Sequence, residues 1–187
     1  ITVVYGANGS GKSSLLYTLL TLKNVILNPN QNPSGFFNYT FASLGSFEAV
    51  VYDHNKRSDI ELGASFEKDG IELMYKTAIG ENKGIFTLFL EDKTRFKFKL
   101  QLPVPFPYPA NQQTQETISH NERSFLVTWN GITAQAQSGV QDPEAQEEAS
   151  RLAITLNSPV ELLRKIGIVP LKRGFSKPHY SSVPVTP

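Results

Sequence analysis

The residues best suited to chemistry in this chain lie near its N-terminus, spaced Gly-x-x-x-x-Gly-Lys-Ser over residues 6–13. Glycines let consecutive backbone N–H groups turn inward around an anion, because no side chain obstructs the approach. At this spacing Lys12 reaches the β- and γ-phosphates of a nucleotide, and the Ser13 hydroxyl ligates Mg²⁺. The pattern predicts a site for ATP and Mg²⁺, with Ser13 on the metal, formed by Gly6, Ala7, Asn8, Gly9, Ser10, Gly11, Lys12, Ser13 and Ser14.

A strand and a helix must position this loop. Ile1–Tyr5 has the apolar pattern of a buried strand, and the residues after the loop predict a helix over 12–22. The N-terminus of that helix adds partial positive charge behind the glycines. The helix should bury an apolar stripe of Leu15, Leu16, Leu19, Leu20 and Leu22. A strand–helix turn without a ligand is the alternative interpretation, and this context argues against it.

The pattern changes to a period of two from residue 59 onward and predicts a four-stranded antiparallel meander over 59–102. Asp69-Gly70 is a strong hairpin-turn signal within it. A proline-rich and polar linker is expected at 103–124. Residues 125–187 should contain a hairpin around Asn130-Gly131, a helix capped by Asp142, a second helix opened by Ser158-Pro159, and a basic tail.

Composition excludes several classes of function. Eighteen basic and 17 acidic residues give a net charge of +1, so the chain as a whole is not an electrostatic binder of nucleic acid. The absence of cysteine excludes disulfides, thiolate catalysis and cysteine-ligated zinc, and suits a cytoplasmic protein. The three histidines, His54, His120 and His179, are too far apart for a local metal motif. No apolar run approaches the roughly 20 residues of a membrane helix.

The segment Gly6–Leu16 resembles the Walker A motif of ABC-type ATPases of the SMC and RecF kind. It is especially similar to the ATPase lobes of the overcoming-lysogenization-defect nucleases and related prokaryotic defence ATPases. Those lobes carry an antiparallel β-subdomain after the P-loop helix, as the meander here would. Ser43–Glu48 and Ile60–Phe66 resemble their linking segment, and Pro170–Arg173 resembles their Pro-Leu-Arg loop.

The resemblance implies an α/β fold: a P-loop NTPase lobe of the ABC-ATPase type with an antiparallel β-subdomain and C-terminal helices. Residues 1–102 would form the P-loop lobe with its meander, 103–124 the linker, and 125–187 a further part of the same lobe.

The Walker B strand and signature loop of that family have only imitations in this sequence. Val50–Asp53 ends in an aspartate about 40 residues after the P-loop, a spacing that small GTPases use. Leu88–Asp92 is better explained as a hairpin turn. Ser138–Gln141 precedes a helix as a signature loop would, but no Asp-Glu strand end follows it. The catalytic residues therefore stay unassigned, as does a Q-loop glutamine among Gln101, Gln112 and Gln113.

Two functions from different classes fit these observations. The first is an ATP-binding N-terminal lobe whose hydrolysis requires a C-terminal half and homodimerisation on ATP, in a chain that we expect to be part of a longer protein. The alternative is a self-contained P-loop switch or kinase with Asp53 as the Walker B carboxylate, and a structural module with a vestigial P-loop is a third interpretation. The tail has an excess of basic residues, namely Arg164, Lys165, Lys172, Arg173 and Lys177. These residues are typical of a solvated tail or of a face that docks against the missing half, and a contact with DNA phosphates is the alternative hypothesis.

Overall fold

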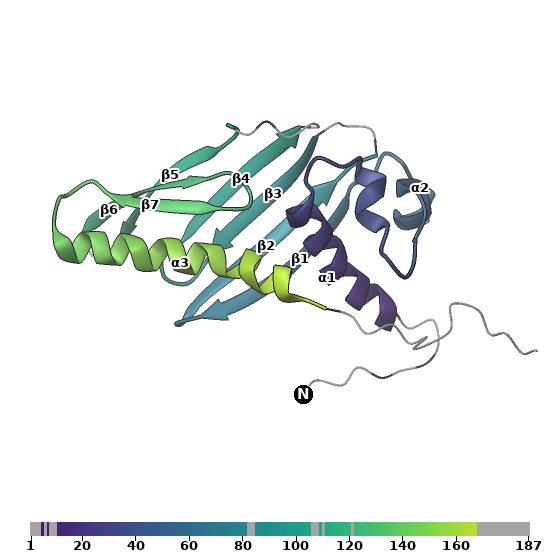
Figure 1. Ribbon diagram of the computed structural model, residues 1–187, viewed down its shortest axis with the longest axis horizontal. Helices are drawn as coiled ribbons and strands as arrows, with labels where there is room; N and C mark the ends of the chain where they lie inside the picture. The colour runs from purple at the N-terminus through teal and green to yellow at the C-terminus, as the bar shows by residue number, and fades with distance from the viewer. Residues whose placement is uncertain are drawn as a thin grey trace, which may run out of the picture.

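The computed structural model describes residues 11–81, 85–105, 111–120 and 122–167, together with Tyr5, Ala7 and Pro109. The predicted strand before the P-loop therefore lies almost wholly outside the described residues. Along the described chain the elements are α1 (Lys12–Leu27), η1 (Pro33–Phe37), α2 (Phe47–Val50), η2 (Tyr52–His54), β1 (Ile60–Lys68), β2 (Ile71–Ile79), β3 (Ile85–Asp92), β4 (Phe98–Pro105), β5 (Thr114–His120), β6 (Arg123–Trp129), β7 (Ala134–Ser138) and α3 (Pro143–Lys165) (Figure 1).

Strands β1 to β4 form an antiparallel sheet in sequence order, so the meander expected at 59–102 is present over 60–105. Half-buried side chains alternate with exposed ones along β1, and buried side chains alternate with more exposed ones along β2, which is the period of two read from the sequence. Asp69 and Gly70 both have positive φ, 54° and 74°, as a type I′ hairpin turn requires.

The predicted linker at 103–124 is wrong at the level of secondary structure. β4 continues through Pro103 and Pro105, which pair with Thr87 and Ile85 of β3. β4 is an edge strand, where a proline nitrogen facing away from the neighbouring strand removes no ladder hydrogen bond. The following polar stretch contains β5, which was missed because its only apolar residue is the buried Ile118.

The second sheet has the order β5-β6-β7 and contains the predicted hairpin around Asn130-Gly131. The Asn130 side-chain oxygen accepts hydrogen bonds from the backbone N–H groups of Ile132, at 3.0 Å, and Thr133, at 2.7 Å. Gly131 has a φ of 90°, which a residue with a side chain rarely adopts. Local turn chemistry therefore fixes the pairing of β6 with β7.

The two predicted C-terminal helices are one continuous helix, α3, with Pro159 inside it. A proline lacks the N–H that would bond to the carbonyl four residues earlier, here that of Thr155. The Ser158 hydroxyl takes that place, donating to the Thr155 carbonyl oxygen at 2.7 Å. Ser158 therefore supplies the hydrogen bond that Pro159 cannot make, and it does not cap a new helix. Both Ser158 and Pro159 are buried against the rest of the fold. The predicted Asp142 cap is present, with its carboxylate accepting from the Glu144 N–H.

One hydrophobic core joins α1, both sheets and α3. The rings of Tyr75 in β2 and Trp129 in β6 meet edge to face, and the Tyr75 hydroxyl donates to the Gly131 carbonyl at 2.9 Å. Figure 1 shows α3 running across one face of the strands, with α1 beside its C-terminal end, where Lys23 donates to the Ile166 carbonyl. The core thus fixes α1, and with it Lys12 and Ser13, against the sheets.

Candidate nucleotide-binding site

The site begins where α1 begins. Gly11 occupies the cap position with φ 81° and ψ 7°, in the left-handed region. A Cβ at Gly11 would meet no heavy atom within 4 Å, so the backbone conformation and not the available space calls for glycine. α1 itself extends to Leu27, five residues past the predicted end at 22, because Val25 and Ile26 continue its buried face.

The Lys12 side chain contacts the first half of the glycine-rich motif. Its ammonium donates to the carbonyl oxygen of Ala7 at 2.6 Å, which joins the first half of the motif to the start of the helix. An ammonium carries three donors, so this bond is compatible with contacts from Lys12 to phosphate oxygens.

The first turn of α1 suits an anion and a hard cation. It contains no acidic residue, so no side chain of its own cancels the partial positive charge of the helix N-terminus. Ser13 and Ser14 are exposed there, which leaves the Ser13 hydroxyl accessible for Mg²⁺. Ala7, Gly11, Lys12, Ser13 and Ser14 are thus placed by the structure. Four predicted site residues lie outside the described residues, namely Gly6, Asn8, Gly9 and Ser10.

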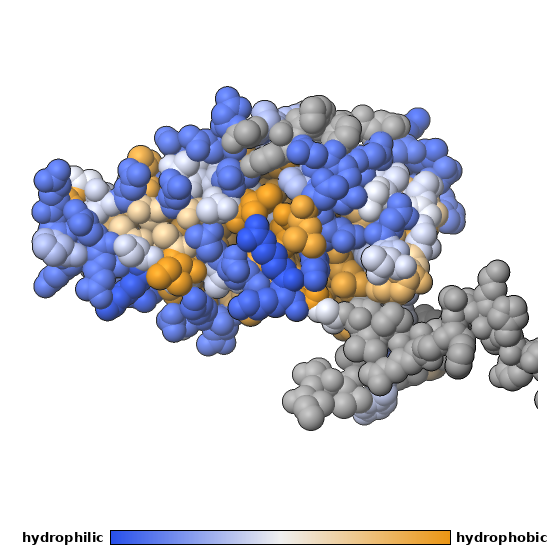
Figure 2. All heavy atoms as spheres, viewed as in Figure 1, coloured by the Kyte–Doolittle hydropathy of each residue, from blue (hydrophilic) through white to orange (hydrophobic). Residues whose placement is uncertain are grey.

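The predicted apolar stripe of α1 is only partly buried. Leu20 and Leu22 are in the core and Leu19 packs against it, whereas Leu15 and Leu16 are 55% and 49% exposed. On the face of the molecule that Figure 2 shows, which is the face seen in Figure 1, apolar side chains lie at the surface among polar ones. The burial of the stripe therefore stops near the N-terminal end of the helix, which leaves apolar surface beside the candidate site.

The proposed switch aspartate, Asp53, does not end a strand. It lies in the short helix η2, exposed, with a φ of 54°. The preceding Val50 ends α2, so no strand runs toward this carboxylate in the described segment 47–54. Asp53 therefore lacks the setting of a Walker B carboxylate.

Asp92 is a turn organiser, as its sequence context predicted. Its carboxylate accepts from the Thr94 hydroxyl at 2.7 Å and from three backbone N–H groups: those of Thr94 at 2.8 Å, Arg95 at 3.4 Å and Phe96 at 2.6 Å. Burial raises the pKa of Asp92, but these hydrogen bonds favour the charged form more strongly, and the pKa lies below its ordinary 3.8.

The third imitation, Ser138–Gln141, connects β7 to α3. A loop that contacts ATP phosphates needs positive surroundings. Here the N-terminus of α3 carries Asp142, Glu144 and Glu148, which converge on Arg123 with N–O distances of 3.1 to 3.3 Å. The carboxylates outnumber the arginine, so this helix end does not favour the binding of a phosphate.

The Q-loop candidates lie on or after β4, and the structure favours none of them. Gln101 is an exposed residue of β4, Gln112 donates its side-chain amide to the Pro103 carbonyl, and Gln113 is exposed.

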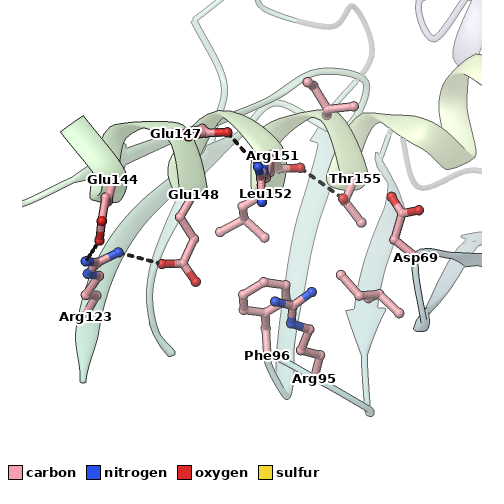
Figure 3. A pocket seen from close by; sticks show the side chains of 12 residues that line it. Asp69, Arg95, Phe96, Arg123, Glu144, Glu147, Glu148, Arg151, Leu152 and Thr155 are labelled. Carbon is pink, nitrogen blue, oxygen red and sulfur yellow. Dashed lines mark hydrogen bonds and ion pairs between the residues drawn. The ribbon is translucent and has the colours of Figure 1, made fainter. Parts of the chain in front are cut away.

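A cavity of about 670 Å³ lies between α3 and the strand ends (Figure 3). Its charged lining consists of three arginines and four carboxylates, namely Arg95, Arg123, Arg151, Asp69, Glu144, Glu147 and Glu148. Arg123 is bound by carboxylates and Arg151 pairs with Glu147 at 2.6 Å, so most of this charge is neutralised internally. None of its lining residues comes from α1, so the cavity is separate from the candidate nucleotide site.

Sequence reasoning missed a group of aromatic side chains beside α1. The rings of Tyr17 and Tyr39 stack with centroids 5.4 Å apart, and Tyr39 stacks on Phe41 at 5.8 Å. Burial raises the pKa of the Tyr39 phenol, and its hydrogen bond with Thr21 lowers it part of the way back. The available signal was weak: Tyr17 follows Ser13 by four residues, and Tyr39 and Phe41 are aromatic residues in a polar loop.

No helix within the described ranges is long and apolar enough to cross a membrane. No group of histidines and carboxylates there could hold a metal ion by itself.

The family model described as "AAA domain, putative AbiEii toxin, Type IV TA system" matches residues 1–157. The chain belongs to this family. The match covers the P-loop, both sheets and most of α3, so it spans the candidate site and the core. Comparison with curated proteins and with solved structures returned no match. Membership of this AAA-domain family assigns the chain to the AAA/ABC-like P-loop ATPase domains, and the α/β architecture with antiparallel sheets and a C-terminal helix agrees with it.

Proposed function

We propose that this chain is the ATP-binding N-terminal lobe of an ABC/SMC-like ATPase. The observation that carries the proposal is the start of α1, where a left-handed Gly11 leads into Lys12 and an exposed Ser13 at an end without acidic residues. Lys12 would hold the β- and γ-phosphates, and Ser13 would ligate Mg²⁺. The bound metal supplies charge neutralisation at the phosphates.

Hydrolysis needs groups that these residues do not supply. A carboxylate must help Ser13 to hold Mg²⁺, and a base must orient the attacking water. Lys12, Ser13 and backbone donors stabilise the ground and transition states to a similar degree, and such uniform binding does not raise kcat. Of the carboxylates that the sequence offered, Asp53 lies in an exposed turn and Asp92 is engaged by its own hairpin. We propose that a C-terminal half of the protein supplies the missing carboxylates.

The exposed leucines of α1 support the proposal that a C-terminal half completes the site. Leu15 and Leu16 expose apolar surface in the turn that follows Lys12 and Ser13. We propose that the C-terminal half covers them, and that two copies close on ATP so that each supplies a signature loop to the other. Residues 125–167 share the core with the P-loop helix, which supports treating them as part of the same lobe.

The self-contained switch or kinase remains the competing function, and hydrolysis by the 187-residue chain separates the two. Our proposal predicts ATP binding with turnover barely above background, because elements supplied in trans are worth about 10³–10⁵ in rate in P-loop proteins. Asp53→Ala should then change nothing. Turnover at about 1 s⁻¹ or faster that is lost in Asp53→Ala would establish the switch instead.

A further inference from the structure

β1 leaves one long edge of the first sheet open. The strand pairs with β2 along its whole length, Ile60–Lys68, without a bulge. It is the outermost strand of its sheet (Figure 1). Within the described ranges, no backbone hydrogen bond outside the β1–β2 ladder involves residues 60–68. Because successive residues of a strand point their N–H and C=O groups to opposite sides, every second residue of β1 offers both groups to a further strand.

Two other strand edges are blocked, which makes the edge of β1 stand out. β4 carries Pro103 and Pro105, whose nitrogens cannot donate a hydrogen bond, and it also lies beside β5. The edge of β7 is occupied by the Asn157 side chain of α3. Its amide donates to the Ala134 carbonyl at 2.9 Å, and its oxygen accepts from the Ala134 N–H at 2.8 Å. Prolines, bulges and covering groups are the usual protection of strand edges, and β1 has no proline and no bulge.

An apolar groove accompanies this edge. It has a volume of about 600 Å³ and lies between the end of β1, at Glu67 and Lys68, and α3. Its α3 wall includes Ile154 and Leu162, which are 60% and 47% exposed. The core-facing side chains of β1 are only half-buried, whereas those of β2 are buried. A strand added to β1 would therefore place its inward side chains on apolar surface.

The outer face of the same edge is acidic. Glu61 and Glu67 lie on this face of β1, and Glu67 is directly opposite Glu72 of β2. All three are exposed, and none forms an ion pair with a basic side chain in the part of the chain that the structure describes. Like charges directly opposite one another destabilise a sheet. Basic side chains on a neighbouring strand would relieve this repulsion.

We propose that β1 binds an extended segment of a partner protein in which apolar side chains alternate with basic ones. Backbone hydrogen bonds to β1 supply affinity, the apolar side chains enter the groove beside α3, and the basic ones lie next to Glu61 and Glu67. A second copy of this chain is a poorer occupant, because antiparallel pairing of two β1 strands about Ala64 would bring Glu61 and Glu67 of the two copies side by side. This interaction is independent of the proposed nucleotide site.

Two synthetic peptides with capped ends, nine residues long like β1, serve as probes. Valine alternates with lysine in one and with glutamate in the other. Fluorescence anisotropy measures the affinity of each for the 187-residue chain. The lysine peptide should bind at least about 10-fold more tightly than the glutamate peptide. It should also slow hydrogen exchange at every second amide of β1, which contact between side chains alone would not do.

Two variants test the groove and the acidic face separately. Ile154→Glu and Glu67→Lys should each weaken binding of the lysine peptide by at least about 5-fold. Val140→Glu is the matched control for the first, because Val140 is 59% exposed and lies outside the groove. Glu116→Lys, at an exposed position on β5, is the control for the second. Both controls should bind the lysine peptide as the wild type does.

No binding of the lysine peptide, equal affinity for the two peptides, or unchanged exchange along β1 overturns the proposal. Equal losses in the variants and their controls also overturn it. If the edge amides of β1 are already protected in the free chain, a second copy or another part of this chain occupies the edge, and the proposal of a partner protein is wrong. Size-exclusion chromatography distinguishes those two occupants.

Discussion

Asp92 gives the structure's sharpest prediction about a single side chain, because its carboxylate is buried and accepts four hydrogen bonds in the β3–β4 turn. Asp92→Ala removes all four, including the short bonds from the backbone N–H groups of Phe96 and Thr94. A hydrogen bond to a charged group contributes roughly 1.5–3 kcal/mol, so loss of these two alone should lower the free energy of unfolding by about 3 kcal/mol at pH 7.

The pH dependence follows from the lowered pKa of Asp92. A carboxylate whose folded pKa lies below its unfolded value stabilises the fold fully above the unfolded pKa, about 3.9, and less as pH falls through the folded pKa. The stability difference between wild type and Asp92→Ala should therefore be constant from pH 7 to about pH 5. It should shrink as the pH falls below about 4.

Urea unfolding at a series of pH values measures this difference. Asp69→Asn is the control, because Asp69 occupies the tip of the β1–β2 hairpin, is exposed, and Asn tolerates its positive φ of 54°. That variant should stay within about 0.5 kcal/mol of wild type. ATP affinity should be unaffected by Asp92→Ala. A neutral effect on stability, or a selective loss of Mg²⁺-dependent ATP binding, would refute the assignment of Asp92 to the turn.

Three further predictions concern the metal ligand, α3 and the basic tail. Ser13→Ala should weaken the Mg²⁺ dependence of ATP binding more than binding itself, measured by titration with and without Mg²⁺; equal losses in both would contradict the metal role. Ser158→Ala should lower the free energy of unfolding in urea by about 1–2 kcal/mol, because the Thr155 carbonyl loses the hydroxyl donor that stands in for the missing N–H of Pro159. Ser150→Ala is the control and should be near neutral, because it removes only an exposed hydrogen bond to the Gln146 carbonyl. Arg164 pairs with Glu161, which leaves four basic residues of the tail for DNA phosphates. If these four residues contact duplex DNA, the slope of log K against log salt should be about −3.6, and a slope near zero rejects the contact.

Local chemistry made much of the fold predictable. The turns Asp69-Gly70 and Asn130-Gly131 dictate positive φ and therefore hairpins, and the Gly11-Lys12-Ser13 sequence dictates the start of a helix. These features need only neighbouring residues, so they are readable without the rest of the structure.

The remainder depends on contacts between distant segments. β5 has one buried apolar residue and exists because β6 pairs with it. α3 continues through Pro159 because the residues around this proline are buried in the core. A local capping signal in the sequence carries no information about that burial. The stack of Tyr17, Tyr39 and Phe41 joins positions up to 24 apart and was likewise out of reach of spacing rules.

Calorimetric titration of the 187-residue chain with ATP and Mg²⁺, beside Lys12→Ala, tests the central claim most directly. Lys12 lies at the surface end of α1, so its replacement should leave the circular dichroism spectrum and the unfolding midpoint unchanged. Lys93→Ala, at an exposed turn, is the matched control and should bind as wild type does. The account predicts wild-type binding with a Kd of about 1 mM or tighter and no detectable binding by Lys12→Ala. Equal ATP affinity of wild type and Lys12→Ala would contradict it.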